Sequence, residues 1–467
     1  MKYSKVDSRI VTELEKLIGS DYVVVDMQTL IDYGADHTEN LVYPPEVLVK
    51  PKTTHQVAQI MQLSQKENIP VTPIGARTGL SGGCLSIYGG IGLSMERFNE
   101  IITIDKDNMQ VVVEPGVITE VLQDQVANCG LYYAPDPASR GSCFIGGNIA
   151  ENSGGPRALK YGVTKDFVLN LEVVLPSGEI IQTGANTLKN STGYNLTQLM
   201  VGSEGTLGVV TKATLKLLPL PKLNKLILVP FKSAIDACKA VAQIFNSGIT
   251  PSALEFMDRF AVDWTINYID DAKLEMSPDT EALLLIEVDG DNEALLFDEI
   301  QKIVEVVETQ NCGSNILFAE DEAQKEQLWF VRRRIGEAVK ANSVYKEEDT
   351  VVPRFRLPDL LNGVKEIGKK YGFESVCYGH AGDGNLHVNI IKGNLSDNQW
   401  ENELPLAIRE IFELTVSLGG TISGEHGIGL VQKQYMDIPF KSVELELMKS
   451  IKAVFDPKML LNPGKII

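Results

Sequence analysis

Two histidines flank a turn-like segment in the second half of the chain. His380 and His387 stand on either side of residues 382–385, whose Gly-Asp-Gly-Asn sequence is typical of a turn between β-strands. The flanking runs 376–378 and 386–390 are β-type, so this turn would bring the two imidazoles side by side. Paired imidazoles are a reasonable pair of metal ligands, and a hydrogen-bonded structural role is the alternative.

A second short motif, residues 423–429, joins a glutamate to a histidine. Glu425 and His426 are neighbours, so their side chains should point in different directions. One of them can therefore complete a metal site while the other acts as a base, a common role of histidine near neutral pH.

Three consecutive arginines, Arg332, Arg333 and Arg334, interrupt an otherwise apolar segment. On a helix they would span about 200° of arc, so at most one or two can face a site. An arginine fork binds a substrate carboxylate through paired, charge-assisted hydrogen bonds. Asn389, two residues beyond His387, would share the strand face of that histidine. A solvated face with salt bridges is the alternative of equal weight for the arginines.

Three glycine-dense stretches lie in the first half, at residues 73–83, 146–155 and 202–208. Glycine lets backbone N–H groups approach an anion closely, so three such loops in an acidic chain favour an anionic ligand held by backbone. The chain has no G-x-G-x-x-G sequence, which leaves the usual dinucleotide-binding fold without support. Tight turns between short strands are the alternative for any single loop.

The predicted helices and strands that would position these residues follow different patterns in the first and second parts of the chain. An amphipathic helix over residues 10–18 precedes a strand at 47–49, a helix with a Thr53–Gln56 capping box, and a strand at 69–74. Short β runs follow to about residue 220, where a Leu-Pro-Leu-Pro sequence indicates a domain exit. The remainder alternates helices with strands such as 283–286, which predicts an α+β domain.

Composition narrows the classes of protein. The 467 residues suggest two to four domains, and a net charge of −19 disfavours nucleic acid and anionic membranes as partners. No run reaches the roughly 18–20 apolar residues of a spanning helix, and the N-terminus lacks the apolar core of a signal peptide. Six scattered cysteines contain no C-x-x-C pair, which argues against a disulfide framework or a bound iron–sulfur cluster. We expect a cytoplasmic protein of several domains without an integral membrane segment.

Residues 43–220 resemble the FAD-binding domain of the FAD-linked oxidase family, of the vanillyl-alcohol-oxidase or p-cresol-methylhydroxylase (PCMH) type. The motifs that carry this resemblance are Pro44-Pro45-Glu46, the loop 75–83, Pro135-Asp136-Pro137, Gly146-Gly147-Asn148 with Asn152, and the loop 202–208. In that family the first loop wraps the pyrophosphate, and the later loops hold the isoalloxazine and ribityl parts. The resemblance implies FAD contacts from Pro73, Gly75, Ala76, Arg77, Thr78, Gly79, Leu80, Ser81, Pro135, Asp136, Gly146, Gly147, Asn148, Ala150, Asn152, Gly155, Gly202, Glu204, Gly205, Gly208, Val209 and Asn462.

The way in which the flavin is held also follows from the resemblance. Some relatives attach FAD covalently through a histidine of the first loop. This chain has Leu80 near that place and no histidine in the loop, so it resembles the non-covalent FAD binders.

Both histidine motifs resemble the C-terminal domain of the same family, in its branch of D-lactate dehydrogenases, D-2-hydroxyglutarate dehydrogenases and the related glycolate oxidase subunits. Carried over, the resemblance implies that His380, His387 and Glu425 bind one divalent metal ion (Zn, Fe or Mn). The same resemblance makes His426 the catalytic base.

The resemblance also names substrate contacts, which are Arg332, Lys346 and Asn389. The chain departs from some relatives at Gly336, where they carry a threonine that contacts the distal group of the substrate. A dicarboxylate that needs that contact is therefore disfavoured.

The implied architecture is α+β, a two-subdomain PCMH-type FAD-binding domain followed by an α+β substrate or cap domain with an antiparallel sheet. We predict an N-terminal helical segment at 1–42, the FAD domain at 43–221 and the cap domain with its metal site at 222–430. Residues 431–467 would return to the FAD domain.

The implied activity is oxidation of a D-2-hydroxy acid, with D-lactate to pyruvate as the expected case, by hydride transfer to the flavin. Some members of the branch pass their electrons to an electron-transferring flavoprotein by flavin-based electron bifurcation, and we expect such a partner or another electron acceptor. The alternatives are a glycolate or D-2-hydroxyglutarate dehydrogenase with a quinone or iron–sulfur partner, a non-redox FAD transferase, and a silent electron-transfer protein.

Overall fold

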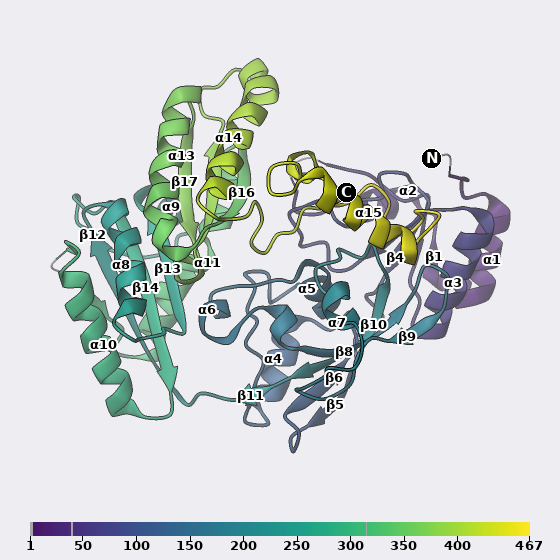
Figure 1. The fold of residues 1–467 in the computed structure, drawn as a ribbon, viewed down its shortest axis with the longest axis horizontal. Coiled ribbons are helices and arrows are strands. Elements are labelled where there is room, and N and C mark those ends of the chain that lie inside the picture. The colour runs from purple at the N-terminus through teal and green to yellow at the C-terminus, as the bar shows by residue number, and fades with distance from the viewer. Residues whose placement is uncertain (1–2, 39–40, 314) are drawn as a thin grey trace. The chain divides into compact units, whose positions relative to one another are not determined.

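The computed structural model describes residues 3–38, 41–313 and 315–467, and these form two compact units (Figure 1). The first unit comprises Met1–Gly154, Gly162–Leu220 and Glu425–Ile467, and the second comprises Gly155–Tyr161 and Pro221–Gly424. Residues 1, 2, 39 and 40 of the predicted N-terminal segment lie outside the described residues.

One sheet of the first unit contains a strand–helix–strand segment. Its order is β1 (Val23–Val24), β2 (Val47–Val49), β4 (Ile91–Ser94) and β3 (Val71–Ile74), with β2 and β3 parallel to β4. The helix α3 (Thr54–Glu67) leads from β2 to β3, and its predicted capping box is confirmed by reciprocal bonds between Thr53 and Gln56. The predicted first helix is also confirmed as α1 (Ser8–Ile18), which buries Ile10, Leu14 and Ile18 in the core of this sheet.

The other large sheet of the first unit is antiparallel. Its strands lie in the order β5 (Ile101–Asp105), β6 (Gln110–Val113), β10 (Val209–Lys216), β8 (Val168–Val174) and β9 (Ile180–Gln182). A short pair joins β7 (Leu131–Tyr132) to β11 (Leu218–Pro219). The other helical elements of this unit are α2 (Met27–Tyr33), α4 (Thr119–Ala127), α5 (Ile145–Glu151), α7 (Leu196–Met200), α15 (Ser442–Phe455), η1 (Ser20–Tyr22), η2 (Thr164–Asp166) and η6 (Lys433–Tyr435).

The second unit is built on one antiparallel sheet, which within the described residues has seven strands. Their order is β15 (Leu317–Phe318), β12 (Leu223–Phe231), β14 (Ala282–Gly290), β13 (Ala253–Asp258), β17 (Glu374–Gly379), β18 (Asn385–Ile391) and β16 (Tyr345–Val351). The α+β prediction with an antiparallel sheet in this part of the chain is confirmed. Short helical elements here are α6 (Ala158–Tyr161), η3 (Arg354–Arg356), η4 (Ala381–Asp383) and η5 (Gln399–Glu403).

Helices cover both faces of this sheet. One face packs its apolar side chains, Tyr378 among them, against α9 (Arg259–Tyr268), α11 (Glu322–Arg333) and α12 (Ile335–Asn342). The helices α8 (Ala234–Asn246), α10 (Glu293–Glu308) and α13 (Leu357–Tyr371) also contact the sheet, and α14 (Leu404–Ser417) packs on α13 (Figure 1). Because α11 carries Arg332 and Arg333 and is followed by Arg334, the face beneath it is the one on which the predicted substrate contacts can meet.

Among the described helices, we find no segment with both the length and the apolar character needed to cross a lipid bilayer.

Candidate active site

Two of the glycine-rich segments are bonded directly to each other in the first unit. The Gly202 N–H donates to the Ile149 carbonyl and the Glu204 N–H donates to the Ala150 carbonyl, both at 2.9 Å. Gly202 and Glu204 adopt positive φ angles of 75° and 49°, which turns their N–H groups toward the end of α5. Segments 146–155 and 202–208 therefore form one backbone-lined surface.

Asn462, near the C-terminus, ties the remaining glycine-rich segment, 73–83, to this surface. Its Nδ2 donates to the Gly83 carbonyl at 2.9 Å and to the Glu204 carbonyl at 2.8 Å, and its side chain is buried. Lys465 completes the contact by donating from Nζ to the Leu85 carbonyl at 2.6 Å. The predicted FAD-contacting segments thus converge within one unit.

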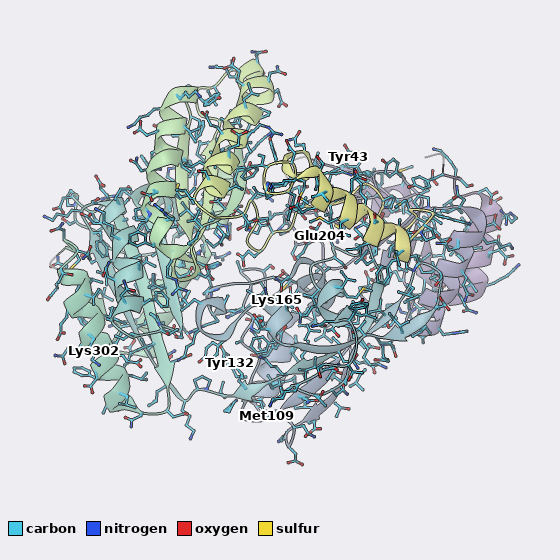
Figure 2. The ribbon with its side chains drawn as sticks, viewed as in Figure 1. Tyr43, Met109, Tyr132, Lys165, Glu204 and Lys302 are labelled. Carbon is cyan, nitrogen blue, oxygen red and sulfur yellow. The ribbon has the colours of Figure 1, made fainter. Side chains whose placement is uncertain are left out.

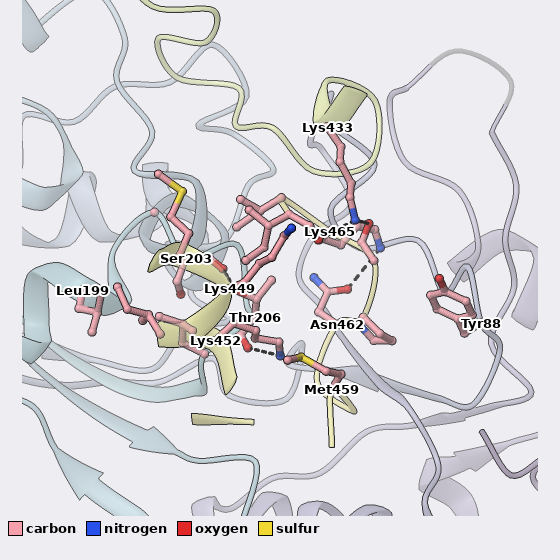
Figure 3. Close-up of a pocket in the computed structure, with 18 of the residues that line it drawn as sticks. Tyr88, Leu199, Ser203, Thr206, Lys433, Lys449, Lys452, Met459, Asn462 and Lys465 are labelled. Atoms are coloured by element: carbon pink, nitrogen blue, oxygen red, sulfur yellow. Dashed lines mark hydrogen bonds between the residues drawn. The ribbon is translucent and has the colours of Figure 1, made fainter. Parts of the chain in front are cut away.

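A cavity of about 530 Å³ lies beside this junction and is lined in part by α15 (Figure 3). Gly202 and Asn462 line it, together with Ser203, Thr206 and Lys452. The Lys452 Nζ donates to the Thr206 carbonyl at 2.7 Å and to the Leu461 carbonyl at 2.8 Å. This lysine therefore holds the 202–208 loop against the C-terminal segment.

The backbone of the predicted loops leaves room for a ligand. A Cβ placed on Gly75, Gly79 or Gly147 would meet no atom within 4 Å. The Ser81 Oγ is buried and has no hydrogen-bond partner among the described residues. A tightly bound phosphate or flavin needs glycine backbone with free space beside it and a hydroxyl that can still form a hydrogen bond. These residues therefore fit such a group.

Several side chains in the predicted set are engaged by protein instead. The Arg77 guanidinium bonds to the Asp32 carbonyl and lies 4.3 Å from the centre of the Tyr33 ring. The Asn148 Nδ2 donates to the Thr119 Oγ1 at 2.6 Å. Ligand contacts at these positions would therefore come from backbone. The other predicted positions lie in the same segments, except that Pro135 and Asp136 follow β7, Val209 begins β10 and Asn462 lies near the C-terminus. Gly155, at the end of its segment, belongs to the second unit.

Two carboxyl groups of these segments lie close to each other: Glu204 belongs to the predicted FAD contacts, whereas Glu151 was not singled out from sequence. Glu151, the last residue of α5, and the buried Glu204 both have raised pKa values. Burial is the main cause for each, and it raises the pKa of Glu204 to about 7 although two backbone N–H groups and Lys465 oppose it. The signal for Glu151 in the residue pattern is weak, because it is only an acid at the end of a helical turn.

In the second unit the two histidines lie side by side, as the turn predicted. His380 follows β17 and His387 lies in β18, with η4 between the strands and Gly384 at a φ of 84°. Both imidazoles are buried, and their ring centroids lie 5.5 Å apart in an edge-on arrangement. Such a pair can supply two nitrogen ligands to one metal ion.

A fully buried carboxylate, Glu255 of β13, contacts both a histidine and an arginine of the predicted site. The His380 Nδ1 lies 2.9 Å from each Glu255 oxygen, and an Arg332 terminal nitrogen lies 2.6 Å from Oε2. Burial favours the neutral acid, but His380 and Arg332 outweigh it and hold the pKa of Glu255 below its usual range. The bond fixes a proton on Nδ1 of His380, so Nε2 carries the lone pair that a metal would need.

Arg332 is the buried member of the arginine run. Its exposed fraction is 6%, whereas Arg333 and Arg334 are exposed, which confirms that only part of the run can face a site. The Arg332 Nε is buried without a hydrogen-bond partner among the described residues, and the guanidinium lies 5.1 Å from the Tyr378 ring centre. A buried guanidinium with an unused donor is suited to an incoming carboxylate.

The register of the strands separates the predicted substrate contacts. His387 pairs with Asp349 and Tyr378, and Asn389 pairs with Glu347, so these side chains share one sheet face. Lys346 pairs with Ile390 on the opposite face, and its Nζ lies 5.7 Å from the Trp400 ring centre. The structure thus brings Asn389 beside His387 and does not bring Lys346 there.

The beginning of the second motif is anchored in the second unit by Asp349. This fully buried carboxylate accepts from the Gly424 N–H at 2.8 Å and from the Asn385 Nδ2 at 2.7 Å. Glu425 and His426, which follow directly, belong to the first unit. There a Cβ placed on Gly154 would lie 2.9 Å from the Glu425 Oε2, so the Glu425 carboxylate lies against the 146–155 segment.

Comparison with known proteins identifies the family. The model for the C-terminal domain of FAD linked oxidases matches residues 220–466, and an FAD binding domain matches residues 45–184. The chain belongs to the FAD-linked oxidase family. FAD is therefore the cofactor for which the glycine-rich segments of this FAD-linked oxidase provide open backbone.

Relatives of this FAD-linked oxidase cover nearly its whole length. It is 37% identical to the D-lactate dehydrogenase of Anaerostipes hadrus, over 100% of this chain and 98% of that protein. It is 38% identical to glycolate oxidase subunit GlcD of Bacillus subtilis (93% and 91%) and 33% identical to the D-2-hydroxyglutarate dehydrogenase of Stutzerimonas stutzeri (98% and 99%). The chain is thus an FAD-linked oxidoreductase of the D-lactate dehydrogenase type.

Solved structures confirm the predicted PCMH-type fold of the FAD-linked oxidase. p-Cresol methylhydroxylase matches with a TM-score of 0.79 at 18% identity, covering 98% of this chain and 96% of that one. An alkyldihydroxyacetonephosphate synthase matches with a TM-score of 0.75 at 18% identity, covering 99% and 86%.

Proposed function

We propose that this FAD-linked oxidase oxidises a D-2-hydroxy acid, with D-lactate to pyruvate as its reaction. The names of its relatives support a small hydroxy acid, and the arrangement around Glu255 supports it most directly. That carboxylate contacts both Arg332 and His380. The proposed carboxylate-binding arginine and the proposed metal-binding histidine therefore both contact Glu255. This arrangement suits a substrate whose carboxylate and hydroxyl are on adjacent carbons.

Arg332 would bind the substrate carboxylate. Its Nε has no protein partner among the described residues, so an incoming carboxylate would satisfy a buried donor. Asn389, on the face of His387, would add a contact, since its buried Oδ1 also lacks a partner among those residues. Lys346 has less support, because it lies on the other face of the sheet.

His380, His387 and Glu425 would hold a divalent ion, Zn, Fe or Mn. Two nitrogens and one carboxylate oxygen are a suitable donor set, and Glu425 is covalently bonded to Gly424, which Asp349 fixes at the histidine hairpin. When bound, such an ion lowers the pKa of a coordinated hydroxyl group. His426, next in the chain, would take the hydroxyl proton as the general base.

FAD, held non-covalently, supplies the acceptor for the C2 hydride when it is bound. No histidine lies in the 75–83 loop to attach it, and Leu80 occupies the region where some relatives carry one. The electrons would then leave to a partner protein such as an electron-transferring flavoprotein. All six cysteines lie among the described residues and are free, which is consistent with an acceptor outside this chain.

The position of Gly336 favours a short substrate. A Cβ placed there would lie 3.2 Å from the Tyr378 hydroxyl. The Tyr378 hydroxyl therefore occupies the space into which a longer side chain or a longer substrate would extend. Glycolate and lactate both lack a long distal arm, whereas D-2-hydroxyglutarate carries a second carboxylate. Glycolate is therefore the alternative substrate that this observation supports.

Anaerobic titration of the FAD-loaded chain with D-lactate, L-lactate, glycolate and D-2-hydroxyglutarate tests the proposal. We expect D-lactate to bleach the flavin absorbance at the lowest concentration. Stronger bleaching by another acid would reassign the substrate. No bleaching by any of the four would contradict the dehydrogenase function and favour a transferase or a silent electron-transfer protein.

A further inference from the structure

The chain that follows His426 is hydrogen-bonded to the side chain of Glu204. One Glu204 carboxylate oxygen accepts from the Ile428 N–H at 2.8 Å and the other accepts from the Gly429 N–H at 2.6 Å. Both donors lie within three residues of His426 and in the same unit. A single carboxylate therefore fixes two consecutive peptide groups of the loop that carries the proposed base.

The backbone of Glu204 belongs to the flavin-binding segments. Its N–H donates to the Ala150 carbonyl at 2.9 Å, and its own carbonyl accepts from the Asn462 Nδ2 at 2.8 Å. Its φ of 49° is unusual for a residue with a side chain, and these backbone bonds together with the two side-chain bonds hold it there. Glu204 is labelled in Figure 2. Glu204 thus connects the flavin-binding loops to the loop after His426.

Glu151 packs against the same loop from the end of α5. A Cβ placed on Gly427, whose φ is 82°, would lie 2.0 Å from the Glu151 Oε2 and 3.0 Å from the Glu204 Oε1. The other Glu151 oxygen lies 3.0 Å from the Cβ position of Gly83, in the first glycine-rich loop. The Glu151 carboxyl is therefore wedged between that loop and the residue directly after His426.

We propose that Glu151 and Glu204 are positioning residues, which fix the position of the His426 imidazole relative to the flavin-binding loops. The inference rests on the proposed function, because it assumes that His426 is the base. Neither carboxyl needs to touch the substrate in this role. Glu204 acts through two peptide hydrogen bonds, and Glu151 acts through close packing on a glycine that cannot bear a side chain.

Glu204→Gln is the first test, because the amide keeps the size of the side chain but offers one acceptor where two are needed. Glu172→Gln is the matched control, since Glu172 is a part-buried carboxylate of the same unit that accepts from the hydroxyls of Thr54 and Thr211. Two quantities are measured on the FAD-loaded chains. They are hydrogen exchange of the Ile428 and Gly429 amides, and the rate of flavin reduction by saturating D-lactate.

We expect both amides to exchange at least about tenfold faster in Glu204→Gln and flavin reduction to slow at least about tenfold. Rates are expressed per bound flavin, because Glu204 also belongs to the predicted FAD-contacting residues, and the apparent Kd for D-lactate should change less than about threefold, because Arg332 belongs to the other unit. Glu172→Gln should match the wild type in both measurements. Faster exchange with an unchanged reduction rate, or unchanged exchange, would overturn the inference.

Gly427→Ala provides an independent variant that keeps both carboxyls. Its methyl group would collide with the Glu151 Oε2 and displace the loop, so flavin reduction should slow as in Glu204→Gln. A wild-type rate in this variant would contradict the role of Glu151. If the unsubstituted chain is reduced by no hydroxy acid, the proposed function fails, and the exchange measurement alone then decides whether Glu204 holds the loop.

Discussion

At the scale of single residues, two buried carboxylates organise the proposed site of the second unit, and neither stands in a recognisable motif. Glu255 lies in the buried strand Ala253–Asp258, and Asp349 lies in β16 opposite His387. Each accepts hydrogen bonds from groups far away in sequence. The sequence indicates which imidazoles could bind a metal, but the tautomer of His380 is set by a partner that only the sheet register places beside it.

Glu255→Gln should weaken both functions that this carboxylate supports. The neutral amide carries no negative charge to pair with His380 and Arg332, so the buried guanidinium of Arg332 loses its counter-ion. We expect a loss of about 3 kcal/mol in the free energy of unfolding and a roughly 10–100-fold weaker affinity for the divalent ion. Chemical denaturation and metal titration measure the two effects, with the exposed Glu374→Gln on β17 as control. Equal metal affinity in both variants would contradict the assignment.

Arg332→Lys tests the carboxylate contact separately from the metal site. A lysine keeps the charge but lacks the paired N–H donors, so KM for D-lactate should rise at least about tenfold with FAD binding intact. The exposed neighbour is the matched control, and Arg333→Lys should leave KM within about twofold. Steady-state kinetics give the comparison, and a similar KM in both variants would remove Arg332 from the substrate site.

At the scale of elements, the parts of the fold that were predictable are those with a strong local signal. The capping box of α3, the helix α1 and the hairpin between β17 and β18 depend on residues close in sequence, and all three are confirmed. The opposite orientations of Lys346 and His387 were not predictable. They depend on how β16 pairs with β18, which is a long-range contact that residue types alone do not fix. The same holds for Glu151, which approaches Gly427 only after folding.

The hairpin that carries the histidines depends on Gly384. Its φ is 84°, and a Cβ there would lie 1.9 Å from the Val352 carbonyl oxygen, so Gly384→Ala must open the turn. We expect a loss of more than about 3 kcal/mol in unfolding free energy. Gly393, after β18, has a smaller positive φ of 48° and open space around its Cβ position, so Gly393→Ala should cost only about 1 kcal/mol. Equal losses by denaturant titration would contradict the packing argument.

At the scale of the whole molecule, the chain carries an excess of acidic groups and also buries ionisable ones where the glycine-rich segments meet. Burial raises the pKa of Glu204 to about 7 and lowers that of Lys465 to about 8. The native state therefore holds the Glu204 proton more firmly than the unfolded chain does, and it releases the Lys465 proton more readily. Stability from Glu204 falls as the pH rises from about 4.5 to 7, and stability from Lys465 rises between about 8 and 10.5.

Glu204→Gln removes the first of these two dependences. The unfolding free energy of the wild-type apoprotein should fall relative to that of the variant by up to about 3 kcal/mol between about pH 5 and pH 8. Glu172→Gln is again the control, because the pKa of Glu172 is lowered and its titration lies below this range. Denaturant unfolding across this pH range measures the difference. A constant difference between wild type and Glu204→Gln would show that Glu204 is ionised throughout.

The central claim is that His426 takes the proton from a hydroxy acid whose hydride leaves to FAD. Rapid-mixing measurement of flavin reduction in His426→Asn tests it most directly, with D-lactate as substrate and FAD content measured in the same sample. We expect FAD to stay bound and reduction to slow by about 10²–10⁴-fold, the usual contribution of a general base. Reduction at the wild-type rate in the FAD-loaded variant would contradict the account.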